Sequence, residues 1–208
     1  MLNQVPKTIP AEMRDFTEWR RGRETYGVWV VRLEDEAILE KSQAAREYLS
    51  GYLLEPYCRQ PHITLFVCGF LVGDPQHSDD FSHEQLQAQV EALKNADLDS
   101  FEIEIGGLSS FASAPFLEVK DPEGGITRLR EILSHGAREF RTAPYRPHLT
   151  VGLYAGTFPS QQVSKRLAGF PCTPIRSRVR QIDFSTYHAR EIAGPLTYVQ
   201  EIVLIALD

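Results

Sequence analysis

Two short segments of the chain carry the same side chains in the same order, and those side chains are suited to acid–base chemistry. The first segment reads Pro61-His62-Ile63-Thr64-Leu65, and the second reads Pro147-His148-Leu149-Thr150-Val151. Both follow the pattern Pro-His-apolar-Thr-apolar, and together they use two of the six histidines. A lone histidine in an apolar strand is usually a hydrogen-bonded core residue, but the repetition indicates a shared role.

The spacing within each segment predicts a strand that turns its histidine and threonine toward one face. Side chains at i and i+2 of a strand project from the same face, so His62 accompanies Thr64. The same spacing joins His148 to Thr150. An imidazole transfers protons near neutral pH, and a hydroxyl holds a phosphoryl oxygen.

Two such pairs facing one another suit an in-line displacement at phosphorus. One neutral imidazole would act as general base while the other, as imidazolium, protonates the departing oxygen. A bell-shaped pH profile with limbs near the unperturbed histidine pKa of about 6.5 is expected from such a pair. Because the two motifs are nearly symmetric, the sequence leaves open which histidine takes which role.

The sequence predicts no metal and no cofactor for this site. A catalytic zinc needs three protein ligands. The chain has neither an HExxH motif nor a cluster of His and Cys, and its three cysteines show no CxxC spacing. Two histidines alone therefore favour metal-free proton transfer.

Three neighbours of the motifs are candidate substrate-binding residues. Period-two alternation places Phe66 on the His62 face and Arg146 on the His148 face, where a ring stacks on a base and a guanidinium binds phosphate. Tyr154 follows the second motif. For each of these residues, a place in the core or in a surface ion pair is at least as good an interpretation.

Composition limits the ligands that such a site would accept. The chain has 208 residues, a formal net charge of −6 and a pI of about 5.6, so as a whole it repels long duplex nucleic acid. A small nucleotide or a short RNA end stays compatible, because a few local donors bind one or two phosphates. No apolar stretch approaches a membrane span, and a cytoplasmic monomer is expected.

Apolar periodicity predicts alternating strands and helices. Strands are expected at 26–33, 62–73, 101–105, 116–119, 148–156, 178–188 and 198–207. Helices are expected at 34–49, at 121–140, at 159–168 and after Ser82, where Gln85 completes a capping box. Three arginines, Arg176, Arg178 and Arg180, alternate along one expected strand; a solvated face is the better interpretation, and a phosphate-binding row is the alternative.

The order of these elements predicts an α+β fold with two related lobes. Strand–helix units occur twice, each with a Pro-His strand at its centre, so each lobe would be a mainly antiparallel sheet flanked by helices. Residues 1–25 are expected to form an arm or short helix packed outside the core, and residues 26–208 one bilobal domain.

The paired motifs resemble those of the two-histidine (2H) phosphoesterase superfamily, which includes the RNA 2′,3′-cyclic phosphodiesterases, also called 2′-5′ RNA ligases. The order of elements from Tyr26 to Leu207 is similar as well. The resemblance implies two sheets related by a pseudo-twofold axis, with a central groove between them. It also implies that His62, Thr64, His148 and Thr150 form the catalytic set.

These observations favour an enzyme that opens nucleoside or RNA 2′,3′-cyclic phosphates, or cleaves related 2′-linked phosphodiesters. Joining of RNA ends, the reverse reaction, is compatible with the same site. The alternative is a module that binds a nucleotide or RNA end without turnover, but intact His and Thr at all four motif positions argue against it.

Overall fold

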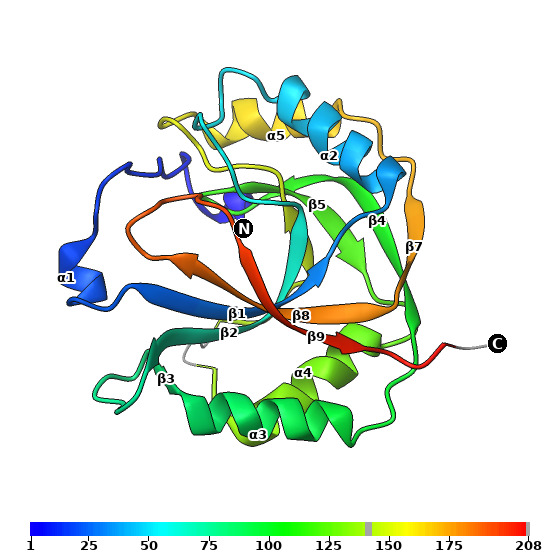
Figure 1. The fold of residues 1–208 in the computed structure, drawn as a ribbon. Helices are drawn as coiled ribbons and strands as arrows, with labels where there is room; N and C mark the ends of the chain where they lie inside the picture. The colour runs from blue at the N-terminus through cyan, green and yellow to red at the C-terminus, as the bar shows by residue number, and fades with distance from the viewer. Residues whose placement is uncertain (140–142, 207–208) are drawn as a thin grey trace.

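A computed structural model describes residues 1–139 and 143–206, which form one curled sheet flanked by helices (Figure 1). The strands are β1 Thr25–Arg32, β2 His62–Val72, β3 Asp80–Ser82, β4 Phe101–Ser110, β5 Pro115–Lys120, β6 His148–Thr150, β7 Ile175–Val179, β8 Gln181–His188 and β9 Thr197–Val203. The helices are η1 Leu2–Gln4, α1 Thr17–Arg20, α2 Glu36–Tyr48, α3 His83–Lys94, α4 Gly125–Gly136 and α5 Ser160–Ala168.

The strand order β7-β4-β5-β6-β2-β1-β8-β9 divides the sheet into two four-stranded halves, with β3 pairing parallel to β2. All other pairings between the named strands are antiparallel within the described residues. Each half begins at the junction with a strand that opens on a motif histidine. The predicted α+β class and two-lobed antiparallel organisation are confirmed, and the two expected sheets are joined into one through Ile63 and Leu149.

The longer helices form two pairs, and the buried apolar residues of both pairs belong to one core. Figure 1 shows α2 beside α5 at one side and α3 beside α4 at the other. Helix α2 begins after Asp35, whose carboxylate accepts a hydrogen bond from Ala37 N at 3.1 Å. Helix α3 begins with the predicted capping box of Ser82 and Gln85.

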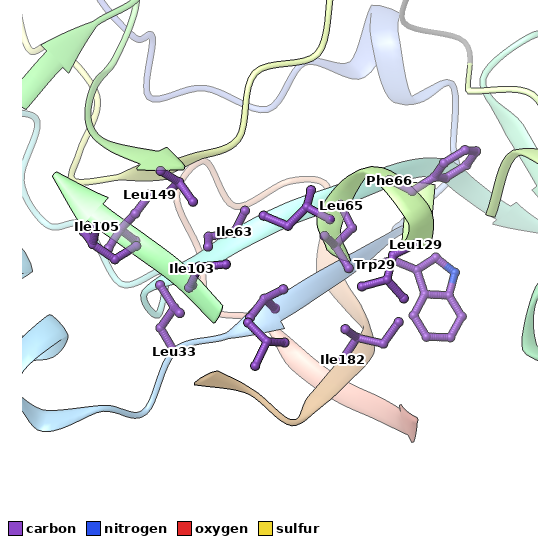
Figure 2. Close-up of a cluster of buried hydrophobic side chains, with 14 of the residues drawn as sticks. Trp29, Leu33, Ile63, Leu65, Phe66, Ile103, Ile105, Leu129, Leu149 and Ile182 are labelled. Atoms are coloured by element: carbon purple, nitrogen blue, oxygen red, sulfur yellow. The ribbon is translucent and has the colours of Figure 1, made fainter. Parts of the chain in front are cut away.

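The apolar run in β1 is continuous because both faces of this strand are buried. Trp29 and Val31 point into the large core under the helices, which Figure 2 shows in part. Tyr26, Val28 and Val30 point to the other face, where a second apolar cluster forms. The second cluster covers the sheet on the side of the motif histidines, because Tyr26 and Val28 also line the pocket described below.

Several element boundaries differ from the sequence prediction. The strand expected at 178–188 is two strands, β7 and β8, which separate at Arg180 and pair with β4 and β1 in different halves of the sheet. The expected arginine row lies largely on β7, where Arg176 is in register with Glu104 and Arg178 with Glu102. Arg176 forms ion pairs with Glu102 and Glu104 across the strand pair, whereas the guanidinium of Arg178 donates to Ser100.

Other elements are shorter or longer than predicted. Helix α4 ends at Gly136, and the last residue of its expected range, Phe140, lies outside the described residues. Strand β6 has three residues, whereas β4 continues through Gly106 and Gly107 to Ser110. The last expected strand ends at Val203, and Leu207 lies outside the described residues.

Residues 1–25 run along the body of the protein and include two short helices. Leu2 is buried in the large core, and Thr8 Oγ1 donates to the carbonyl of Gly156 at 2.8 Å. Arg23 forms ion pairs with Asp79 and Asp80 beside β3. Among residues 1–139 and 143–206, no helix has both the length and the apolar character needed to cross a bilayer.

Candidate active site

The two motifs meet where the halves of the sheet join. Ile63 and Leu149 are antiparallel partners, and both are fully buried in the core beneath the junction (Figure 2). Antiparallel pairing about this point sets each motif histidine near the threonine of the other motif, on the opposite face from the core. The prediction that the motifs meet across one site therefore agrees with the register.

His62, Thr64, His148 and Thr150 line one pocket of about 260 Å³. The walls come from β1, β2, β8 and four loops, and they contribute aromatic, apolar and cationic side chains: Tyr26, Val28, Tyr57, Arg59, Val67, Phe111, Ala114, Leu153, Tyr187 and Ala193. No sequence pattern indicated Tyr57, Arg59 or Phe111.

Both imidazoles are held by the same backbone hydrogen bond. Nδ1 of His62 lies 2.7 Å from the carbonyl oxygen of Gln60, and Nδ1 of His148 lies 2.7 Å from that of Arg146. A carbonyl accepts and does not donate, so Nδ1 carries the proton in each neutral ring. Nε2 is then the basic nitrogen of both rings, which is the requirement for proton transfer at a substrate.

The surroundings of the two rings differ. The pKa of His62 is lowered to about 4, mainly by burial; the bond to Gln60 opposes this shift, and the positive charges of Arg59 and of a protonated His148 add to it. His148 packs against two phenylalanine rings, with centroids 4.9 Å from Phe111 and 5.3 Å from Phe116. The surroundings of His148 are therefore aromatic, whereas those of His62 include the cation Arg59.

Arg59 brings a fixed positive charge to the wall of the pocket. Its Nε donates to the carbonyl of Gly194 at 3.0 Å, and its guanidinium lies over the ring of Tyr187, 4.0 Å from the centroid. These contacts hold the side chain in place before a ligand arrives. Arg59 lies three residues before His62, and this proximity in sequence is the one signal that could have indicated it.

Phe66 does not share the His62 face, so the prediction from strand alternation was wrong. Thr64 is in register with Val30 but Phe66 with Trp29, so β2 carries one extra residue, Leu65, at a bulge. Phe66 is consequently 1% exposed and packs in the core with Trp29 (Figure 2). Val67 lines the pocket at the position where Phe66 was expected.

The other two candidate binding residues also lie away from the pocket wall. Tyr154 is fully buried, with its hydroxyl 2.7 Å from Ser110 Oγ. Arg146 forms an ion pair with Glu118 at 2.6 Å on the surface. The ordinary structural interpretations, a core aromatic and a surface ion pair, therefore hold for both residues.

Within residues 1–139 and 143–206, no group of three or more acidic, histidine and cysteine side chains is arranged to hold a metal ion. The motif residues and Arg59 bring two imidazoles, two threonine hydroxyls and one guanidinium to the pocket.

The two-halved sheet and the paired His-x-Thr strands at its junction define a two-histidine phosphoesterase. The chain belongs to the 2′-5′ RNA ligase superfamily, whose family model matches residues 33–191. The resemblance inferred from the motifs is thereby confirmed.

Solved structures share the fold at low sequence identity. Escherichia coli LigT in its apo form is 15% identical and superposes with a TM-score of 0.58 over 88% of this chain and 99% of its own. E. coli LigT complexed with 3′-AMP is 13% identical, with a TM-score of 0.57 over 88% and 99%. TT0787 of Thermus thermophilus is 14% identical, with a TM-score of 0.57 over 86% and 97%. A search of curated proteins finds no significant match.

Proposed function

We propose that this protein is a metal-independent phosphodiesterase that opens nucleoside or RNA 2′,3′-cyclic phosphates, or cleaves related 2′-linked phosphodiesters. The observation that carries the proposal is the pocket in which two His-x-Thr pairs meet with both imidazoles oriented by the same Nδ1 hydrogen bond. The ligand is a small nucleotide or a short RNA end. E. coli LigT, which shares the fold, has been crystallised with ATP and with 3′-AMP, and these complexes support a nucleotide ligand.

In the proposed reaction, His62 is the general base. Its lowered pKa keeps the ring neutral at physiological pH, so Nε2 accepts a proton from the attacking water. The water oxygen forms a bond to phosphorus as the bond from phosphorus to one ribose oxygen breaks. The product is a phosphomonoester on the other ribose oxygen.

His148 is the general acid in this reaction. Its imidazolium donates the Nε2 proton to the departing ribose oxygen, so no alkoxide has to leave. The rings of Phe111 and Phe116 pack against the ring of His148. The face of an aromatic ring attracts a cation. Proton exchange with solvent returns His62 to its neutral form and His148 to its protonated form after each turnover.

The remaining polar groups of the pocket bind the phosphoryl group. Thr64 and Thr150 donate hydrogen bonds to its non-bridging oxygens, and Arg59 offsets its negative charge. Because Arg59 is already fixed by Gly194 and Tyr187, little side-chain freedom is lost when the phosphate binds.

Hydrolysis of a panel of phosphodiesters in excess EDTA tests the proposal. The panel contains a nucleoside 2′,3′-cyclic phosphate, ADP-ribose cyclic phosphate and a 2′-5′ dinucleotide. We expect turnover of at least one member that persists with EDTA and disappears in His62→Ala and His148→Ala. Turnover that requires added metal, or that survives both substitutions, would refute the mechanism.

A further inference from the structure

A second hollow of about 410 Å³ adjoins the pocket of the two histidines. The two hollows share Tyr57, Arg59 and Thr150, so they form neighbouring parts of one groove. The far wall of the second hollow is helix α2, which contributes Ser42 and Arg46. A ligand that occupies the first pocket can therefore extend past Arg59 toward α2.

The lining of the second hollow suits an anion. Two guanidinium groups, of Arg46 and Arg59, face it, and the residues that line it include no carboxylate among those the structure describes. Arg46 does pair with Glu55, at 3.2 Å, but Glu55 is 64% exposed, so solvent and salt weaken this pairing. Arg46 can therefore leave the solvent-screened carboxylate of Glu55 and bind a phosphate instead.

Arg46 is also held in place before any ligand binds. Its Nη1 donates to the carbonyl of Val151 at 3.4 Å, and its guanidinium lies 4.8 Å from the ring centroid of Tyr57. A guanidinium that is fixed and only partly exposed binds phosphate better than a mobile one. The ring of Tyr57 adds an apolar surface against which a sugar or base packs.

We propose that the second hollow binds the phosphate and nucleoside next to the reacting nucleotide, so the preferred substrate contains at least two nucleotides. The inference rests on the proposed function, because it assumes that the reacting phosphate lies between the two histidines. Arg59 then lies between the reacting phosphate and the next one, since it borders both hollows. The first hollow, of about 260 Å³, lies below the roughly 300–1,000 Å³ of pockets for drug-sized ligands, so a larger ligand extends into the second hollow as well.

A comparison of three adenosine substrates tests the inference. They are adenosine 2′,3′-cyclic phosphate, its 5′-phosphorylated form, and the dinucleotide ApA with a terminal 2′,3′-cyclic phosphate. We expect the dinucleotide to have the highest kcat/KM, about tenfold above the unphosphorylated mononucleotide, which corresponds to one additional charged contact. The 5′-phosphorylated form separates the contribution of the phosphate from that of the second nucleoside.

The variant Arg46→Gln should lower the ratio of dinucleotide to mononucleotide kcat/KM by about tenfold. Arg166→Gln is the matched control. Arg166 also bonds to a backbone carbonyl, that of Tyr48 at 3.1 Å, and lies over the Tyr48 ring at 3.7 Å, but it lines neither hollow. The control should keep the ratio of the unmodified protein.

Binding of phosphomonoesters, which the enzyme cannot open, distinguishes failure of this inference from failure of the proposed function. The dinucleotide with a 3′-phosphate should bind more tightly than 3′-AMP, and Arg46→Gln should abolish the difference. If this preference holds but no substrate is hydrolysed, the proposed function is wrong and the subsite stands. If the substrates are hydrolysed equally well, or if both arginine variants change the ratio alike, the subsite is overturned.

Discussion

The two motif segments share one backbone arrangement but provide two different environments for their histidines. Each ring is anchored through Nδ1 to the carbonyl two residues earlier, at 2.7 Å in both cases. His62 is surrounded by protein and faces the cation Arg59, whereas His148 packs against two phenylalanines. The repeated motif thus gives both histidines the same orientation. The residues around the motifs give the two histidines different environments.

The arginines before the two motifs differ in the same way. Arg59 is fixed against Tyr187 and lines the pocket, whereas Arg146 pairs with Glu118 and does not. The place of the side chain, on the pocket wall or on the outer surface, therefore separates Arg59 from Arg146. A symmetric motif can produce an asymmetric site, in which burial favours the neutral form of one imidazole while the other packs against aromatic rings.

The largest effect is expected from removing either motif histidine. Each positioned proton transfer contributes about 10²–10⁴ in rate, so His62→Ala and His148→Ala should each lower kcat by that factor. His83→Ala, at an exposed position on α3, is the control and should retain full activity. Steady-state rates with a cyclic phosphate provide the measurement; a loss in only one of the two variants would mean that the halves do not act as a pair.

The motif threonines should matter less than the histidines. Removing one hydrogen bond to a charged phosphoryl oxygen costs about 1.5–3 kcal/mol, so Thr64→Val and Thr150→Val should each lower kcat/KM by roughly 10- to 100-fold. Equal losses would indicate that both halves hold the phosphoryl group. A loss above that of the histidine variants would contradict the assigned roles.

The arginines sharpen the comparison of the halves. Arg59→Gln should lower kcat/KM by about tenfold, because a charged contact to phosphate is lost. It should also raise the pKa of His62, because the positive charge of Arg59 lowers that pKa. Arg146→Gln is the matched control from the other half and should change kcat/KM less than twofold. Equal effects of the two variants would show that the ion pair with Glu118 does not distinguish them.

The smallest effect is expected at Tyr154, which belongs to the structure of the second half. Tyr154→Phe removes the hydroxyl that lies 2.7 Å from Ser110 Oγ and should lower the free energy of unfolding by about 1 kcal/mol. Its kcat/KM should remain unchanged, because Tyr154 is fully buried. Urea denaturation and steady-state assays together test this prediction. A change in KM with unaltered stability would indicate that Tyr154 contributes to substrate binding.

Sequence reasoning identified the parts of the site that regular structure determines. The i, i+2 spacing placed His62 with Thr64, and the same spacing placed His148 with Thr150, because strand periodicity fixes which side chains share a face. The fold class followed from the repeated order of strands and helices. These features depend on local patterns that one sequence displays.

The residues that sequence reasoning missed or misplaced depend on contacts between distant segments. Tyr57 and Arg59 lie in the loop before β2, where no periodicity indicates a direction. Phe66 moved to the core because a bulge at Leu65 reversed the alternation, and the partner strand determines where a bulge forms. Similarly, β7 and β8 separate at Arg180 because they pair with strands in different halves.

The pH dependence of kcat/KM in excess EDTA tests most directly whether the two unequal imidazoles act as base and acid without metal. The account predicts activity that persists in EDTA and falls on acidification only near pH 4, where His62 becomes protonated and can no longer accept a proton. Far-ultraviolet circular dichroism at each pH verifies that the protein stays folded. An acid limb at about 6.5, the ordinary histidine value, or loss of activity in EDTA, would contradict the account.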